Sequence, residues 1–239
     1  RWQGLAVTRW REDSTRDPWG SYLYLRDLAT GAVWSATHQP TRVEAGSYTV
    51  EYDDHCAVFR RRDHGLATTV EVIVSPEDDA ELRRVSITNH GRRAVDLELT
   101  SYAEVVLASP ASDLAHPAFS NLFVQTEFVQ GLGALLATRR PRSLGAPTIW
   151  AAHMAVVDGS CEGPSGYESS RATFLGRGRD PARPSAIHDG VALSNTVGSV
   201  LDPILSLRCR VRIPPGGTTR VTFSTLVAQS REEVVRLSD

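Results

Sequence analysis

Aromatic and polar side chains are interleaved in one short segment near the amino terminus. A tryptophan ring can stack on the C–H surface of a sugar, while arginine and carboxylate groups hydrogen-bond hydroxyl groups in fixed directions. Six residues of the segment have these properties: Trp10, Arg11, Asp13, Arg16, Asp17 and Trp19. The pattern predicts a carbohydrate-binding site, and the simpler alternative is a surface loop whose tryptophans pack on the edge of the domain.

A second polar segment separates two predicted strands within Ser101–Phe128. Its connection of about 15 residues is long for a compact domain, and such connections are usually functional or form a packed cover. The connection contains Asp113, His116 and Asn121. We include His116 and Asn121 among the predicted substrate-binding residues, although a lone histidine before a proline is more often a local hydrogen-bonding residue.

The sequence contains no catalytic signature, such as a nucleophile elbow, a zinc-binding helix motif or a phosphate-binding loop. Paired carboxylates, which glycoside hydrolysis requires, occur side by side at Asp78-Asp79. These two residues lie in a predicted turn after Pro76, where acidic side chains are usually solvated. We therefore assign no catalytic residue.

The three cysteines, Cys56, Cys161 and Cys209, are too scattered for a disulfide framework, and none has the spacing of a metal site. Cys56 and Cys209 lie in predicted strands and are expected to be small core residues. The run Arg60–Arg62 also lies in a predicted strand, where alternation sends its members to opposite faces. We expect these arginines at a solvated or interface surface, and we expect no metal ion or cofactor.

The composition of the 239-residue chain is that of an ordinary globular protein, with 41% hydrophobic and 23% charged residues. Its formal net charge of −2 gives no reason to expect a nucleic acid or an anionic membrane as partner. No apolar run approaches the roughly 20 residues that cross a bilayer, so we expect no direct membrane insertion. Since the chain starts at Arg1 without a signal peptide, we expect a soluble fragment excised from a larger protein.

Alternation of apolar and polar residues predicts a succession of β-strands separated by turn residues. The predicted strands are Ser21–Arg26, Ala32–Ala36, Tyr48–Tyr52, Ala57–Arg62, Ala67–Val74, Glu81–Thr88, Ala94–Tyr102, Leu122–Phe128, Ala134–Arg139, Ile149–Val157, Pro203–Ile213 and Thr218–Ala228. Arg171–Gly176 is a further short candidate strand, and Gly178–Gly190 is predicted to be irregular. So many strands predict an all-β fold, a large antiparallel two-sheet sandwich.

One helix start is convincing, and it lies at the carboxyl end of the chain. Ser230 followed by Glu233 fits a capping box, and an apolar helix face begins at Val234. We therefore expect a sandwich domain over residues 1–229 and the start of a helical segment over residues 230–239.

Seven segments resemble the amino-terminal sandwich domain of the inverting disaccharide phosphorylases (the cellobiose and chitobiose phosphorylase family) and the related region of cyclic β-1,2-glucan synthases. The segments are TRWREDSTRDPWGSYLYLRD (8–27), WSATHQPT (34–41), FRRRDHG (59–65), VSPEDDAELRRVSITN (74–89), LTSYAEVVL (99–107), HPAFSNLFVQTE (116–127) and LDPILSLRCRVRIPPG (201–216). Their collinear order is more specific than any one segment. The sequence Trp19-Gly20-Ser21-Tyr22 replaces the Gly-Gly-Arg-Tyr-like sequence of the phosphorylases, which favours the glucan-synthase side.

The resemblance implies a β-supersandwich similar to that of galactose mutarotase, followed in the family by a helical linker and an (α/α)6 barrel. The barrel carries the general acid and would be the missing catalytic domain of the same parent chain. Residues 230–239 would then be the start of the linker. The sandwich would pack on the barrel, contribute to a dimer interface and lend loops to the edge of the active site.

Three functions are open at this point. The first is a non-catalytic module of a cyclic β-1,2-glucan synthase-like glycosyltransferase, which binds a β-glucan or oligosaccharide or holds neighbouring domains, in a bacterial parent at the inner membrane. The second is the sandwich and homodimerisation domain of a glycoside phosphorylase with a cytoplasmic parent. The third is a mutarotase-type epimerase, with His116 and either Glu104 or Glu127 as acid and base.

Overall fold

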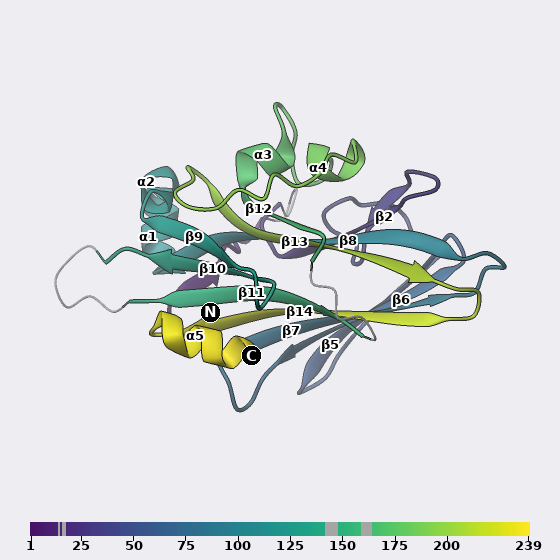
Figure 1. The fold of residues 1–239 in the computed structure, drawn as a ribbon, viewed down its shortest axis with the longest axis horizontal. Coiled ribbons are helices and arrows are strands. Elements are labelled where there is room, and N and C mark those ends of the chain that lie inside the picture. Colours follow the sequence, from purple (N-terminus) through teal and green to yellow (C-terminus); the bar gives the residue numbers. More distant parts are fainter. Residues whose placement is uncertain (14, 16–17, 142–147, 159–163) are drawn as a thin grey trace.

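The computed structural model describes residues 1–13, 15, 18–141, 148–158 and 164–239. These residues form two antiparallel β-sheets that stack face to face, with short helices at the periphery (Figure 1). The predicted all-β fold with two antiparallel sheets and a carboxyl-terminal helix is therefore confirmed. Within the described ranges, no helix is long and apolar enough to cross a bilayer.

The larger sheet has the strand order β4-β5-β6-β7-β14-β11-β10-β9. Its strands are β4 (Ser47–Tyr52), β5 (Cys56–Asp63), β6 (Leu66–Val74), β7 (Ala80–Asn89), β9 (Val124–Val129), β10 (Ala134–Arg139), β11 (Trp150–Val157) and β14 (Thr218–Ala228). Sequential strands pair as hairpins at each end of the sheet, and β14 lies between β7 and β11. This late strand therefore joins two groups of strands that are distant in the sequence.

The smaller sheet has the strand order β12-β13-β8-β2-β3, and β1 also pairs with β8. Its strands are β1 (Ala6–Thr8), β2 (Tyr22–Asp27), β3 (Val33–Ser35), β8 (Val95–Ala108), β12 (Gly166–Ser170) and β13 (Pro203–Ile213). One side of the strand β8 pairs with two strands in succession. Residues 97–102 of β8 pair with β2, and residues 105–108 pair with β1. The length of β8 therefore brings the amino-terminal segment to the far end of the smaller sheet.

The main hydrophobic core lies between the two sheets, because alternate side chains of every strand point inward. Leu97 and Leu99 of β8 face this core together with Val85 and Ile87 of β7, and all four are fully buried. Complete burial of one such side chain stabilises the fold by roughly 1.5–3 kcal/mol.

The cysteines differ in burial. Cys209 lies in the core between the sheets, as predicted. Cys56 is only half-buried at the start of β5, where its thiol contacts the carboxyl group of Asp53. Its predicted core position is therefore wrong, because the strand begins at this residue and the sheet does not yet cover it. Cys161 lies outside the described residues.

Helices cover parts of both outer sheet faces (Figure 1). The helices α3 (Arg171–Leu175) and α4 (Ser185–His188) form an apolar cluster with tyrosines of the smaller sheet. The helix α5 (Arg231–Ser238) buries Val234 against the larger sheet. Ser230 accepts a hydrogen bond from the backbone N–H of Glu233 at 3.1 Å, so the predicted helix cap is confirmed, while the carboxylate of Glu233 accepts from the backbone N–H of Gln229 at 3.3 Å. The continuation of α5 as a linker to a further domain stays a prediction.

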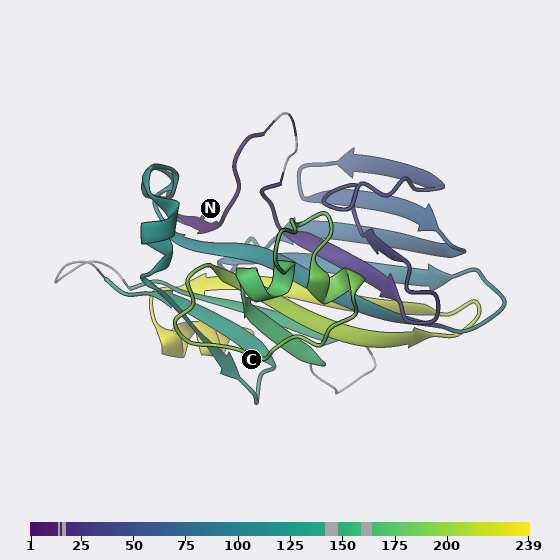
Figure 2. The same ribbon diagram turned by 90° about the horizontal axis from the view of Figure 1, so that it is seen from above.

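Several short elements differ from the prediction. The long connection in the middle of the chain contains two helices, α1 (Pro110–Ala115) and α2 (Pro117–Asn121), and Figure 2 shows them beside the end of the amino-terminal strand. The predicted strand at Arg171–Gly176 is wrong, since Ser170 caps the helix α3 there. The helix α4 lies in the segment predicted to be irregular. Helices of four to six residues are too short to show a helical period in the sequence.

Candidate functional site

Strand pairing between β1 and β8 places Arg9 against Glu104. The backbone N–H of Arg9 donates to the carbonyl oxygen of Glu104 at 2.9 Å. Their side chains form an ion pair and are 5% and 3% exposed. Charges buried to this degree persist only when they are paired and hydrogen-bonded. The pair therefore fixes the direction in which the amino-terminal segment leaves the sheet.

The helix α1 brings a second carboxylate to the same guanidinium group. Ser109 caps α1 by accepting a hydrogen bond from the backbone N–H of Ser112 at 3.2 Å. Asp113 then accepts from Nη2 of Arg9 at 2.8 Å and from Nη2 of Arg11 at 3.0 Å. One residue of α1 therefore holds two residues of the amino-terminal segment, from which it is separated by more than 100 positions.

Further contacts extend this cluster to the smaller sheet. Asn121 accepts from Nη2 of Arg9 at 3.1 Å and donates to Asp202 at 2.9 Å. Arg171 pairs with Asp202 at 3.2 Å and with Glu104 at 2.8 Å. We call the following residues the arginine network: Arg9, Arg11, Tyr102, Glu104, Asp113, Asn121, Arg171 and Asp202.

Two carboxyl groups of the arginine network, those of Asp113 and Asp202, have pKa values shifted in opposite directions. Burial alone would raise the pKa of Asp113, but hydrogen bonds from Arg9 and Arg11 outweigh it and hold that pKa below its ordinary value. Burial, together with the charge of Glu104, raises the pKa of Asp202. Because its charge is stabilised in this way, Asp113 acts as a fixed anion of the network and not as a proton donor.

Trp19 packs against the network, while Trp10 stays open. The Cζ atoms of Arg11 and Arg9 lie 5.0 and 5.9 Å from the centroid of the Trp19 ring, within the range of a cation–π contact. The side chain of Trp10, between these two arginines in the sequence, is 64% exposed. The network therefore holds one tryptophan in place and leaves its neighbour available to a ligand.

A cavity of about 600 Å³ adjoins the exposed tryptophan, and we call it the Trp10 cavity. Its walls come from the amino-terminal segment, β7 and α1, and they include Trp10, Arg11, Glu12, Arg83 and Leu114. An exposed indole ring, an apolar side chain and hydrogen-bonding groups of both signs therefore surround one hollow. Ligand pockets combine apolar walls with a few oriented polar groups in this manner.

Of the three further residues of the predicted sugar-binding segment, the structure describes Asp13. Asp13 accepts a hydrogen bond from the backbone N–H of Thr15 at 2.8 Å, which is a local turn contact. Arg16 and Asp17 lie outside the described residues. Their assignment to the site stays a prediction.

The two predicted residues from the middle of the chain occupy different environments. Asn121 is buried in the arginine network, where it orients a guanidinium group instead of facing a cavity. His116 is exposed between α1 and α2. Of its two suggested carboxylate partners, Glu104 is buried in the network and Glu127 pairs with Arg231 at 2.7 Å. The suggested acid–base pair therefore lacks a free carboxylate.

The sequence analysis named four of the eight members of the network and missed Arg9, Tyr102, Arg171 and Asp202. Glu104 interrupts the apolar run of β8, where an unpaired charge would be costly, so its position in the sequence already points to a buried partner. Arg9 adjoins the predicted segment but was not included in it. Arg171 begins the short helix α3 and Asp202 precedes β13, and neither gave a signal, because their contact depends on the fold alone.

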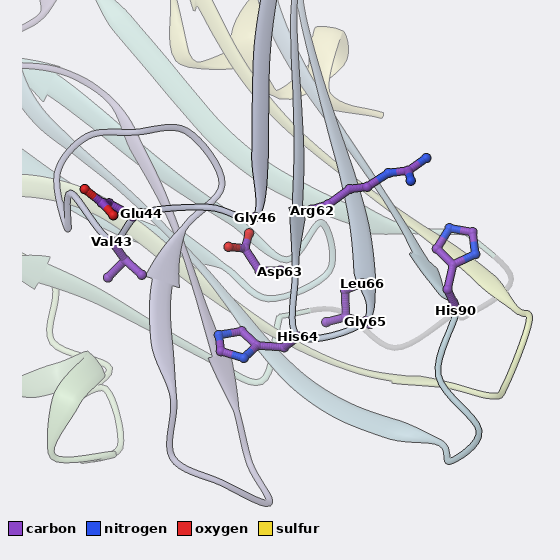
Figure 3. Close-up of a pocket in the computed structure, with 9 residues that line it drawn as sticks. All are labelled: Val43, Glu44, Gly46, Arg62, Asp63, His64, Gly65, Leu66 and His90. Atoms are coloured by element: carbon purple, nitrogen blue, oxygen red, sulfur yellow. The ribbon is translucent and has the colours of Figure 1, made fainter.

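A second cavity, of about 510 Å³, lies beside the turn between β5 and β6 (Figure 3). Its polar lining includes Glu44, Arg62, His64 and His90, and we call it the His64 cavity. The aromatic ring nearest to His64, that of Trp34 at 5.1 Å, is buried in the core. Within the described ranges, no group of three or more His, Cys, Asp or Glu side chains is arranged to hold a metal ion. Because Trp34 is buried and no other described tryptophan lines the His64 cavity, this cavity lacks the exposed indole that distinguishes the Trp10 cavity.

Arg61 of β5, which was predicted at a solvated or interface surface, is only 1% exposed. Its guanidinium group pairs with Asp63 and donates to the carbonyl oxygens of Thr37 at 3.2 Å and Val43 at 2.8 Å. The prediction is wrong for Arg61, because these acceptors allow the inward face of β5 to bury a charge. It is confirmed for the exposed residues Arg60 and Arg62.

Comparison with known proteins identifies the family. Residues 1–239 match the family model described as the supersandwich domain of glycosyl hydrolase 94. The chain belongs to this family. The supersandwich fold implied by the sequence resemblance is therefore confirmed. A solved bacterial glucoamylase complexed with acarbose has the same fold, with a TM-score of 0.58 at 7% sequence identity over all of this chain and 30% of the glucoamylase chain.

The relatives of this supersandwich domain are much longer than the domain itself. It is 41% identical over 239 residues to the cyclic β-(1,2)-glucan synthase NdvB of Rhizobium meliloti (strain 1021), covering all of this chain and 8% of the synthase. It is 28% identical over 233 residues to the N,N'-diacetylchitobiose phosphorylase of Vibrio furnissii, covering 96% of this chain and 28% of the phosphorylase. Both relatives are bacterial, as predicted.

Proposed function

We propose that this supersandwich domain is a non-catalytic module that binds a β-glucan chain at the Trp10 cavity and holds it for the catalytic domain of its parent protein. The observation that carries the proposal is the convergence of the amino-terminal segment and α1 through the arginine network. Because Arg11 and Trp19 are fixed before a ligand arrives, little conformational entropy is lost when a sugar binds beside them.

The carboxylates around the Trp10 cavity support a binding function over a hydrolytic one. Hydrolysis of a glycosidic bond needs two carboxyl groups that flank the bond, one of them able to donate a proton. Asp113 is held as an anion by two arginines, and Glu81 pairs with Arg83 at 2.7 Å. Glu12 is then the one carboxylate among the described wall residues without a guanidinium partner.

The similarity to the glucan synthase supports the assignment of the parent protein. The identity to the synthase is 41%, against 28% to the chitobiose phosphorylase, and in both cases most of the relative lies outside the matched region. We therefore assign the parent as a glycosyltransferase of the cyclic β-1,2-glucan synthase type at the bacterial inner membrane. Its catalytic domain would adjoin this domain after α5.

Titration calorimetry with linear β-1,2-glucan oligomers tests the binding function, with cello-oligosaccharides as the linkage control. We expect the wild-type domain to bind the β-1,2-linked oligomers with a dissociation constant of about 0.1–1 mM, and Trp10→Ala to weaken binding at least ~tenfold, or ~1.4 kcal/mol. The matched control is Val156→Ala, which removes an exposed apolar side chain of β11 that lines neither named cavity. Equal affinity of the wild type and Trp10→Ala would contradict the proposal.

Homodimerisation is a second candidate function, which the edge of the larger sheet favours. The strand β4 ends the strand order, so one of its edges has no strand partner among the described residues. Tyr52, at the end of this strand, is 76% exposed, and Val74 of β6 is also exposed. Light scattering at about 100 µM protein tests this function. A dimer that Tyr52→Arg dissociates would support it, and a wild-type monomer would refute it.

A further inference from the structure

Trp19 has a second surface beyond the one that stacks on the arginine network. The ring also lines a separate cavity of about 240 Å³, whose other walls come from residues 39–42, Arg171 and residues 180–182. We call this the Trp19 cavity. It has less than half the volume of the Trp10 cavity, so it suits a single sugar ring and not a chain. The two cavities adjoin the same contact, because Trp19 lines this one while Arg9 and Arg11, which stack on Trp19, line the Trp10 cavity.

The walls of the Trp19 cavity are held in place from behind. The hydroxyl group of the buried Tyr24 donates to the carbonyl oxygen of Pro181 at 2.7 Å, which anchors the 180–182 wall to the smaller sheet. On the opposite wall, Arg171 is fixed by its ion pairs with Glu104 and Asp202. A cavity with walls already in position binds a small ligand without an ordering cost.

Two polar groups of opposite sign are available to a ligand in this cavity. The side chain of Arg171 is 27% exposed, and its Nη2 atom has no partner in the described part of the chain. Asp180 is exposed and uses Oδ1 to accept the backbone N–H of Ala182 at 3.0 Å, which leaves Oδ2 without a partner among the same residues. A guanidinium donor and a carboxylate acceptor can bind neighbouring hydroxyl groups of one sugar ring.

The balance of charge around the Trp19 cavity favours a neutral ligand. Glu104 and Asp202 already offset the charge of Arg171, and Asp180 faces the same hollow as Arg42. No excess positive charge is therefore left to attract an anion such as phosphate.

We propose that the Trp19 cavity is a second sugar subsite, which takes one neutral pyranose ring of the chain bound in the Trp10 cavity. The C–H face of this ring would lie on Trp19, and its hydroxyl groups would bind Arg171 and Asp180. This inference rests on the proposed function, because both cavities would bind the same glucan chain.

Two substitutions test the subsite without touching the arginine network. Ala182→Leu fills the Trp19 cavity, and Asp180→Ala removes its carboxylate acceptor. The matched controls are Ala29→Leu, in the exposed turn after β2, and Asp189→Ala, which breaks an exposed pair with Arg179. The affinity of each variant is measured by calorimetry with linear β-1,2-glucan oligomers of increasing length.

The subsite predicts that wild-type affinity rises with oligomer length until the chain reaches both cavities. Ala182→Leu and Asp180→Ala then lose this last increase, ~tenfold or more, while both control variants bind like the wild type. If Ala182→Leu binds long oligomers as tightly as the wild type and Trp10→Ala does not, the subsite is wrong and the proposed function stands. If the wild type binds no oligomer, both fail.

Inorganic phosphate tests whether the Trp19 cavity binds an anion in place of a neutral sugar. Phosphate should give no heat with the wild type at the concentrations at which the oligomers bind. Heat from phosphate that disappears in Ala182→Leu would overturn the assignment of a neutral ligand.

Discussion

Arg61 and Arg9 are both buried guanidinium groups, but they connect very different stretches of chain. Arg61 pairs with Asp63, two positions away, and with two backbone carbonyl oxygens beneath the His64 cavity. Arg9 pairs with Glu104 and Asp113, each about 100 positions away, beside the Trp10 cavity. The first set of contacts holds the connection between β3 and β4 on the strand β5. The second assembles a surface from segments that only the complete fold brings together.

The two arginines differ in how much of the neighbouring surface depends on their buried charge. The surroundings of Arg61 need little beyond β5 and the neighbouring loop, and the cavity above them has no exposed aromatic ring. Around Arg9, the loss of one carboxylate would release the amino-terminal segment and the two tryptophans that it carries. Substitutions in the two regions should therefore differ in both stability and binding.

The largest effect is expected from Glu104→Gln, which leaves the buried guanidinium group of Arg9 and the partly exposed one of Arg171 without their shared carboxylate. The free energy of unfolding should fall by about 3–5 kcal/mol, because the three guanidinium groups of the network then share two carboxylates and one buried positive charge is uncompensated. Asp63→Asn also leaves a buried guanidinium group without its carboxylate, but it affects Arg61 alone and the two carbonyl acceptors of Arg61 are retained, so the expected cost is smaller, about 1–3 kcal/mol. Urea unfolding monitored by circular dichroism measures both values. A larger loss for Asp63→Asn would contradict the comparison.

A buried histidine that contacts neither Arg9 nor Arg61 should account for a large part of the loss of folding stability at acid pH. His153 contacts Ser101 at 2.8 Å and Thr225 at 3.0 Å between the sheets, and burial, aided by the charge of Arg83, lowers its pKa from 6.5 to about 4. The unfolded chain therefore binds this proton first as the pH falls. The contribution to stability is complete above pH 6.5 and is lost between pH 6.5 and 4, by about 3 kcal/mol in all.

The variant His153→Gln tests the origin of this acid sensitivity, because glutamine keeps a polar group and does not titrate. Unfolding free energies measured from pH 7.5 to below pH 4 should show a flatter profile for the variant than for the wild type. Parallel profiles for the two proteins would exclude His153 as the source. The matched control is His90→Gln, which makes the same substitution at an exposed histidine of the His64 cavity.

The smallest effects on stability are expected from two more exposed arginines, Arg11 in the arginine network and Arg60 beside Arg61. Arg11→Ala removes two hydrogen bonds to Asp113 and the cation–π contact with Trp19, at a cost of about 1–2 kcal/mol. Arg60→Ala removes an exposed pair with Glu51 and should cost below about 0.5 kcal/mol. Tryptophan fluorescence should shift to longer wavelength in Arg11→Ala alone. Equal costs with unchanged spectra would remove the distinction between the regions.

The long strands of the fold were predictable, whereas the partners of the charged residues were not. Alternation gave β13 and β14 with their observed bounds, because eleven residues with a period of two leave an unambiguous pattern. The amino-terminal tryptophans and Arg11 were predicted as a site from residue type alone. The role of Arg171 was not predictable, since it depends on a β8 strand long enough to bring Glu104 next to β1.

Nuclear magnetic resonance mapping of backbone amides during titration with linear β-1,2-glucan oligomers tests the central claim most directly. One experiment on the unaltered domain reports on the Trp10 cavity and on the His64 cavity. The account predicts shifts of the Glu12 and Leu114 amide signals at the Trp10 cavity, with those of Gly65 and His90 unchanged. Shifts confined to Gly65 and His90, or no shifts at all, would contradict it.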